Sequence, residues 1–252
     1  MTKRYIALFV ALSLTLSLAA LAGCTSNKPA SVYLVKKATA YDSAGQISMQ
    51  TEYSYAKNGC LVSLTRFIAA SDYSEESNTY ITYEGINEDG YPEKMYTSAN
   101  GSSSSVSYEY QVDNNQVIKR TASDGSYEDY TYYPDGKLKT SYQYSETSQS
   151  SRKYDEDGYL SSQVFTSSSG KTTSDYQWKF DSQGTPTEVA VNQDFGSLNI
   201  DSSTTTFSLQ CDENGNIVRE YNEDGSLISE YEYTRIDNPC AAAIIESYKH
   251  AR

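Results

Sequence analysis

The stretch Tyr154-Asp155-Glu156-Asp157-Gly158-Tyr159-Leu160 contains the signs of a strand end, a tight turn and a strand start within seven residues. An aspartate side chain accepts hydrogen bonds from backbone amides further along the turn, and glycine adopts the positive φ that a hairpin requires. The acidic side chains keep the turn in water. Such a unit is typical of a hairpin that joins two antiparallel strands.

The same unit recurs along most of the chain. Close copies lie at 41–47, 211–217 and 221–227, and looser copies lie at 55–61, 86–92, 133–138 and 180–186. The repeat spans roughly 20–30 residues and contains two turns, a spacing that predicts repeated hairpins.

Between the turns, apolar and polar residues alternate with the period of a β-strand. One stripe contains Val106, Tyr108, Tyr110 and Val112, and a second contains Leu138, Thr140, Tyr142 and Tyr144. We therefore predict an all-β fold with about 15 or more strands. It forms a long antiparallel meander of repeated hairpins over 33–236, in a curled or rolled sheet.

A short C-terminal helix is predicted within 237–252. Asn238 is a favourable N-cap, Pro239 suits the first helical position, and an apolar stretch follows from Ala241. We expect this helix to cover the last open strand edge or one end of the core.

Tyrosine takes the place of aliphatic residues in the predicted core. The chain contains 25 tyrosines but only six phenylalanines and one tryptophan. We expect each ring to be buried while its hydroxyl group reaches water, which suits a sheet with a shallow buried face.

The N-terminus has the features of a secretory signal over residues 1–23. A basic start with Lys3 and Arg4 precedes an apolar run over 6–22, which ends at Leu21-Ala22-Gly23-Cys24. This ending resembles the lipobox of bacterial lipoproteins. The resemblance implies that Cys24 carries diacylglycerol and palmitate and that 24–32 forms a tether. It also implies a membrane-anchored, extracytoplasmic protein, either periplasmic or at the cell surface. The alternative is an ordinary signal peptide with a chance cysteine.

The repeated turns resemble the YD-repeat of the RHS family, which reads approximately Tyr-x-Tyr-Asp-x-x-Gly-x-Leu or Ile. The resemblance covers most of 33–236, although Phe180 and Cys211 replace the tyrosine in two copies. Large members of that family close their repeats into a shell around a toxin. This chain is shorter, so the resemblance implies the meander and not the delivery function.

Charge and composition exclude several classes of function. The net charge of −13 and the pI of about 4.5 argue against nucleic-acid binding. The single histidine, His250, leaves little room for histidine-based catalysis or a histidine metal site. We predict no cofactor and no metal site.

Paired carboxylates occur repeatedly at the turns, and we interpret them as turn chemistry. Two alternatives stay open: a glycan hydrolase that uses two of them, and a calcium site. The pairs are Glu88/Asp89, Asp155/Asp157, Asp212/Glu213 and Glu223/Asp224.

Two further sets of side chains are candidates for a site. Tyr176, Trp178 and Phe180 form the best aromatic platform for a glycan or peptide, with the alternative that they belong to the core. For the cysteines that remain besides Cys24, we predict a Cys211–Cys240 disulfide, with buried thiols as the alternative.

These observations predict a non-catalytic cell-envelope protein held to the membrane through the lipid on Cys24. Its function would be to bind an envelope protein or glycan. A glycan-active hydrolase and a structural spacer are the alternatives.

Overall fold

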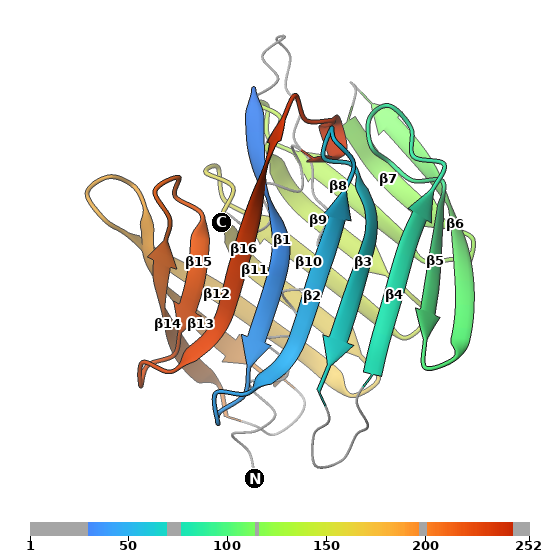
Figure 1. Ribbon diagram of the computed structural model, residues 1–252. Helices are drawn as coiled ribbons and strands as arrows, with labels where there is room; N and C mark the ends of the chain where they lie inside the picture. The colour runs from blue at the N-terminus through green and yellow to red at the C-terminus, as the bar shows by residue number, and fades with distance from the viewer. Residues whose placement is uncertain (1–29, 70–76, 114–115, 197–200, 244–252) are drawn as a thin grey trace.

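The computed structural model describes residues 30–69, 77–113, 116–196 and 201–243. These residues form sixteen antiparallel strands in one sheet, which closes into a barrel (Figure 1). The strands are β1 (Ser31–Tyr41), β2 (Ile47–Tyr55), β3 (Leu61–Ile68), β4 (Ser77–Glu84), β5 (Lys94–Ala99), β6 (Ser102–Asp113), β7 (Gln116–Ala122), β8 (Tyr127–Tyr132), β9 (Leu138–Tyr144), β10 (Ser148–Tyr154), β11 (Leu160–Ser167), β12 (Gly170–Phe180), β13 (Pro186–Asp194), β14 (Ser203–Cys211), β15 (Ile217–Tyr221) and β16 (Leu227–Asp237).

The strand order confirms the antiparallel meander and corrects its expected shape. Every strand pairs with its neighbours in sequence, and β1 pairs with β16 from Ser31↔Asp237 to Ala40↔Ser229. The sheet is therefore closed, whereas the sequence predicted a curled or rolled meander. Closure is favourable because it satisfies the backbone donors and acceptors of both edge strands.

The turns form as their sequence predicts. In the turn between β10 and β11, the Asp155 carboxylate accepts hydrogen bonds from the amides of Asp157, at 3.0 Å, and Tyr159, at 2.8 Å. Gly158 has a φ of +93°. A residue with a side chain would be strained in this conformation, whereas glycine adopts it readily. A register shift where Tyr154 meets Leu160 introduces a bulge at this hairpin.

The C-terminal segment lies across part of one end of the barrel, here called the cap end (Figure 1). After β16, the chain runs between the β2–β3 and β4–β5 turns. The amide of Cys240 donates to the carbonyl of Asn58, and the amide of Ala242 donates to the carbonyl of Asp89, each at 2.8 Å. An apolar group, here called the cap cluster, is buried beneath this segment and consists of Val32, Leu34, Cys60, Ile236, Cys240, Ala242 and Ala243.

The C-terminal helix begins later than predicted, and it has one of its two expected roles. Helical structure begins at Ala241 and continues to Ala243, and residues 244–252 lie outside the described part. Asn238 is not the N-cap, because it has a φ of +52° and its amide donates to the carbonyl of Ala30. The segment covers an end of the barrel, since β1 and β16 leave no edge between them for it to cover.

The start of the barrel also differs slightly from the predicted boundary. β1 begins at Ser31, and Val32 is buried in the cap cluster. The predicted tether over 24–32 therefore extends two residues into the barrel. The serine-rich stretch at 102–105 pairs with β5 as part of β6.

Tyrosines fill the interior but use their hydroxyl groups differently from the prediction. The hydroxyl of Tyr55 donates to the carbonyl of Val35, that of Tyr132 to Val117 and that of Tyr233 to Ile217, at 2.8, 2.5 and 2.8 Å. These hydroxyl groups bind backbone carbonyls of neighbouring strands, whereas the sequence predicted that they reach water. Burial raises the pKa of Tyr132 and Tyr233 well above the usual range.

Candidate functional site

The two faces of the barrel wall have different chemistry. On β13, Val189, Val191 and Gln193 are buried, while Asn192 and Asp194 between and beside them are exposed. The buried face is the inner wall, because the sheet is closed. Charged residues pair across strands on the exposed face, as in Lys37–Glu52 on β1 and β2 and Lys179–Glu188 on β12 and β13.

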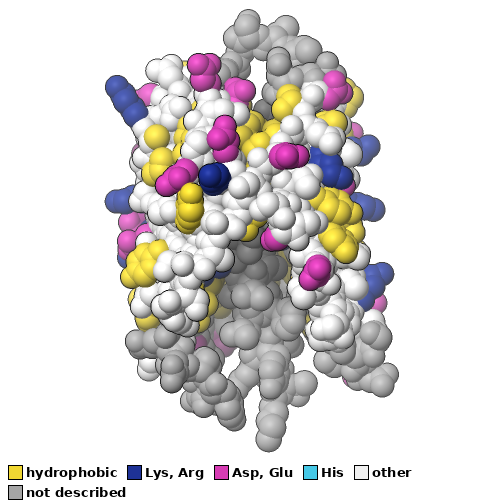
Figure 2. Space-filling view, turned by 90° about the vertical axis from the view of Figure 1, so that its right-hand side faces the viewer, with side chains coloured by type: hydrophobic (Ala, Val, Ile, Leu, Met, Phe, Trp, Pro, Cys, Tyr) yellow, Lys and Arg dark blue, Asp and Glu magenta, His cyan; other side chains and the backbone are white. Residues whose placement is uncertain are grey.

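The outer wall carries many polar and charged groups on the side that is visible in Figure 2. On the side that carries β5 and β6, Figure 2 shows lysine, arginine, aspartate and glutamate side chains scattered among other polar groups, with smaller hydrophobic patches. No helix among the described residues is long and apolar enough to cross a membrane.

The predicted aromatic platform on β12 is largely core. Tyr176 and Trp178 pack against a buried cluster of Val189, Val191 and Phe207. The indole nitrogen of Trp178 donates to the carbonyl of Leu160 at 2.9 Å. These two rings therefore hold strands together, as the core alternative proposed.

Phe180, the third ring of that set, follows a register shift between Lys179 and Phe180 and is 44% exposed. Its ring lies 5.0 Å from that of Tyr159, which also contacts Trp178 at 5.1 Å. One exposed ring at a strand end does not provide the predicted platform.

Another aromatic group lies on the outer wall, on β8 and β9. The rings of Tyr127 and Tyr144 stack with centroids 5.1 Å apart and an interplanar angle of 22°, and Tyr142 lies 6.0 Å from Tyr127. Tyr142 is paired with Asp129 and Tyr127 with Tyr144. All four side chains therefore share one face, where the Asp129 side chain is 45% exposed.

Charged groups border these rings. The ammonium group of Lys119 lies 4.3 Å from the centroid of Tyr127 and 3.5 Å from the carboxylate of Asp129. We call Tyr127, Tyr142, Tyr144, Lys119 and Asp129 the tyrosine surface. It combines aromatic faces with hydrogen-bonding groups at their margin, which is an arrangement suited to a ligand that has both apolar and hydroxyl surfaces.

Sequence reasoning missed the tyrosine surface because of one bulge. The stripe Leu138, Thr140, Tyr142 and Tyr144 was expected to share one buried face. The register moves from Thr131↔Thr140 to Tyr132↔Leu138, so Leu138 is buried while the two tyrosines face outward. The recurrence of the turn unit at 133–138 was the available signal, because such turns carry bulges here.

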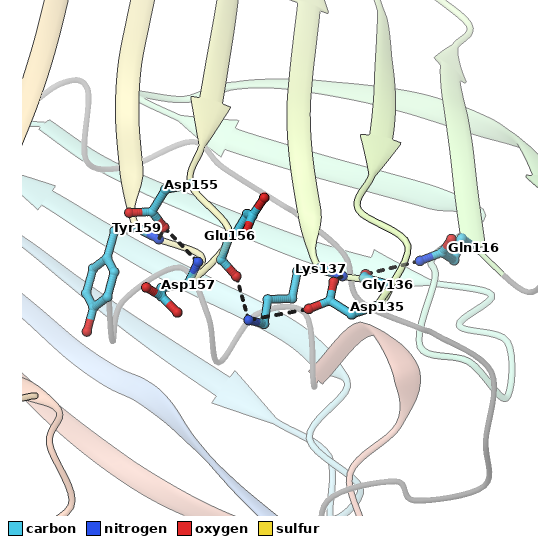
Figure 3. A network of polar contacts seen from close by, with 8 residues as sticks. All are labelled: Gln116, Asp135, Gly136, Lys137, Asp155, Glu156, Asp157 and Tyr159. Carbon is cyan, nitrogen blue, oxygen red and sulfur yellow. Dashed lines mark hydrogen bonds and ion pairs between the residues drawn. The ribbon is translucent and has the colours of Figure 1, made fainter.

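The paired carboxylates of the turns are largely used to build the turns. Figure 3 shows two neighbouring turns at the cap end, where the Lys137 ammonium group reaches the Glu156 carbonyl at 2.5 Å and the Asp135 carboxylate at 3.4 Å. Asp155 accepts the two amides described above. Figure 3 also shows the side-chain amide of Gln116 donating to the carbonyl of Gly136.

Other members of the predicted pairs have similar partners. Asp212 accepts the amides of Asn214 and Asn216, each at 2.9 Å. Asp224 accepts the amide of Ser226, and Glu223 accepts the amide of Thr206. Within the described ranges, no three His, Cys, Asp or Glu side chains come together in a way that suits a metal ion.

Two carboxylates lie inside the barrel. Glu128 forms an ion pair with Arg120 at 2.9 Å and also accepts the hydroxyl of Tyr130. Glu220 accepts the hydroxyl of Tyr231 at 3.3 Å, and burial raises the pKa of Glu220 despite stabilising hydrogen bonds from its neighbours. Each group thus has a structural partner on the inner wall.

The cysteines are arranged differently from the prediction. Cys240 lies against Cys60, with their sulfur atoms 2.9 Å apart. Cys211 instead lies on β14, where its thiol is 3.5 Å from the carbonyl of Pro186. The structure therefore does not bring Cys211 and Cys240 together as the predicted disulfide requires. Cys24, the predicted lipid-bearing residue, is outside the described residues.

The chain matches no protein-family model and no curated protein sequence. Among solved structures, a chain of the TcdB2-TccC3-Cdc42 crystal structure aligns with 82% of this chain and 14% of its own length, at 12% identity and a TM-score of 0.41. The chain thus spans about one seventh of that protein.

Porin-like proteins from two Bacteroides species also align with the chain. The protein from Bacteroides uniformis aligns over 81% of this chain and 96% of its own length, with 12% identity and a TM-score of 0.37. The protein from Bacteroides vulgatus aligns over 80% of this chain and 98% of its own length, with 12% identity and a TM-score of 0.31. These are distant likenesses, so the proposals below rest on the residues of this chain.

Proposed function

We propose that this protein is a lipid-anchored, extracytoplasmic and non-catalytic barrel that binds envelope glycan through the tyrosine surface. The N-terminal sequence supports the anchor, because its lipobox places a cysteine directly after a signal peptide. The outer-wall ion pairs support a barrel that stands in water while the lipid on Cys24 holds it at the membrane.

The stacked pair Tyr127–Tyr144 is the observation that carries the binding proposal. These rings, with Tyr142 beside them, lie on the outer wall of a rigid sheet, where they are accessible without a change in the fold. Sugar rings present apolar C–H faces that stack on aromatic rings, and their hydroxyl groups bond to flanking charged groups. Lys119 and Asp129 supply such groups.

The absence of catalysis is part of the proposal and is supported by the partners of the carboxylates. Glycoside hydrolysis uses two carboxyl groups that flank the scissile bond. The turn carboxylates Asp155 and Asp212 bind backbone amides, and Glu128 is held by Arg120. These groups have structural roles that account for their positions.

Calorimetric titration tests the proposal with two probes, soluble peptidoglycan fragments and a neutral maltooligosaccharide. We expect the full-length protein in mild detergent to bind the peptidoglycan fragments and to leave them uncleaved after long incubation. Tyr144→Ala should weaken binding at least about tenfold, the effect of losing roughly 1.4 kcal/mol.

Tyr96→Ala is the matched control, since Tyr96 lies on β5 and is also exposed on the outer wall. Equal binding by Tyr144→Ala and the wild type would refute the tyrosine surface as the site. Cleavage of the fragments would instead support the hydrolase alternative. Failure to bind either probe would favour the spacer alternative.

A further inference from the structure

The cap cluster contains two cysteines that the sequence separates by 180 positions. Cys60 follows the β2–β3 turn, and Cys240 follows the last strand. Their side chains are 3% and 4% exposed. Both are thiols in this structure, with their sulfur atoms 2.9 Å apart.

The backbone around the two thiols fixes their approach. The Cys240 amide donates to the carbonyl of Asn58, two residues before Cys60, at 2.8 Å. Within the β2–β3 turn, the amide of Ala56 donates to the carbonyl of Cys60 at 2.9 Å. The thiols therefore meet because two ordered backbone segments bring them together, and their sulfur atoms lie about 0.9 Å beyond the length of a disulfide bond.

A glycine from a third segment closes over the sulfur atoms. A Cβ atom at Gly90, on the β4–β5 turn, would lie 2.6 Å from the Cys240 sulfur and 3.1 Å from the Cys60 sulfur. Gly90 also has a φ of +91°, so a side chain there is both strained and blocked. The pair is thus enclosed by the β2–β3 turn, the β4–β5 turn and the C-terminal segment.

We propose that Cys60 and Cys240 form a disulfide in the exported protein and that this bond fastens the C-terminal segment over the cap end. The export signal would deliver the chain to an oxidising compartment, where disulfides form and persist. In the reaction, both cysteines lose a proton and together give two electrons to the disulfide of an exported thiol oxidoreductase. One sulfur–sulfur bond forms in this protein, one breaks in the oxidant, and the oxidant leaves as two thiols.

The burial of the pair determines when this reaction takes place. Burial and the neighbouring Cys240 raise the pKa of the Cys60 thiol to about 12, so little of the reactive thiolate is present in the folded protein. Oxidation therefore takes place while the C-terminal segment is still docking. Once formed, the bond is shielded from reductants until the cap opens.

Peptide mapping of the lipoprotein purified from its native envelope, with thiols blocked at lysis, tests this proposal. We expect a cross-linked peptide pair that contains Cys60 and Cys240, and Cys211 in the blocked, reduced form. The Cys211→Ser variant should retain the cross-link, whereas Cys60→Ser and Cys240→Ser should lose it without forming another.

Stability measurements separate the bond from a packing effect of the thiols. A reductant should lower the unfolding midpoint of the wild type and of Cys211→Ser, and it should leave the Cys60→Ser/Cys240→Ser double variant unchanged. Blocked thiols at both Cys60 and Cys240 in the native protein, or a cross-link through Cys211, would overturn the proposal. Because the assay involves no glycan, its outcome is independent of the proposed binding function.

Discussion

Replacing Glu128 by glutamine should strongly destabilise the barrel, because it leaves Arg120 charged and unpaired on the inner wall. The side chains of Arg120 and Glu128 are 14% and 12% exposed, and their ion pair spans 2.9 Å. Arg120 also lies 4.7 Å from the centroid of the Tyr108 ring. Burial lowers the pKa of Arg120, but Glu128 and the neighbouring tyrosine side chains together more than offset this effect, so the pKa is raised and the arginine stays charged.

The expected loss follows from the cost of an unpaired buried charge. Removing one partner of a buried ion pair costs about 3–5 kcal/mol. We expect about 3 kcal/mol for Glu128→Gln, since both side chains retain slight solvent contact and the amide preserves one acceptor oxygen. For a domain of this size that corresponds to a decrease of about 6–12 °C in Tm.

An outer-wall pair provides the control. Lys37 and Glu52 are 3.8 Å apart, with side chains 30% and 59% exposed, and pairs of this kind contribute about 0–1 kcal/mol. Glu52→Gln should therefore lower the free energy of unfolding by less than about 1 kcal/mol. Replacing both inner partners, as Arg120→Met with Glu128→Leu, should recover much of the loss because no charge remains buried.

Urea unfolding followed by tryptophan fluorescence measures these differences. The chain has a single tryptophan, and Trp178 lies on the inner wall beside a buried cluster. Its emission should shift when the barrel opens. Equal losses for Glu128→Gln and Glu52→Gln would refute the reasoning, as would a double variant Arg120→Met with Glu128→Leu that is less stable than Glu128→Gln.

Three further outcomes are expected from urea unfolding of single variants. Burial raises the pKa of Glu220, so the folded protein binds a proton on this carboxylate more tightly than the unfolded chain does. The resulting stabilisation is complete below a pH of about 4.3, and it is lost as pH rises through the folded-state pKa. Glu220→Gln should remove that pH dependence, so its stability relative to the wild type should rise between about pH 4 and pH 7; an unchanged difference would contradict this. Asp155→Ala should cost about 1–2 kcal/mol, because two backbone amides lose their acceptor, whereas Asp155→Asn should be nearly neutral, since Asn222 accepts the same two bonds in its own turn. Tyr132→Phe should cost about 1–2 kcal/mol by leaving the Val117 carbonyl without its hydroxyl donor, and an effect below about 0.5 kcal/mol would show that water replaces it.

The local features of the fold were predictable because they depend on neighbouring residues. A turn such as 154–160 contains its own acceptor, its own glycine and its own strand ends, and the structure forms it as expected. The large number of strands and their antiparallel order follow from repetition of that unit.

The candidate sites were less predictable because bulges change which face a side chain occupies. Each bulge adds one residue to one strand and reverses the alternation beyond it. Leu138 is buried while Tyr142 and Tyr144 face outward, although the sequence places all three in one stripe. Tyr176 and Trp178 are part of the core because β13 and β14 pack against them.

The turn chemistry, the tyrosine-rich strands and their antiparallel succession could be read from the sequence, since each is encoded within a few consecutive residues. The closure of β1 on β16 and the contact of Cys240 with Cys60, and not with Cys211, became visible only in the folded barrel. Those contacts join residues roughly 180 or more positions apart. They depend on the accumulated twist and register of all sixteen strands, which no local pattern specifies.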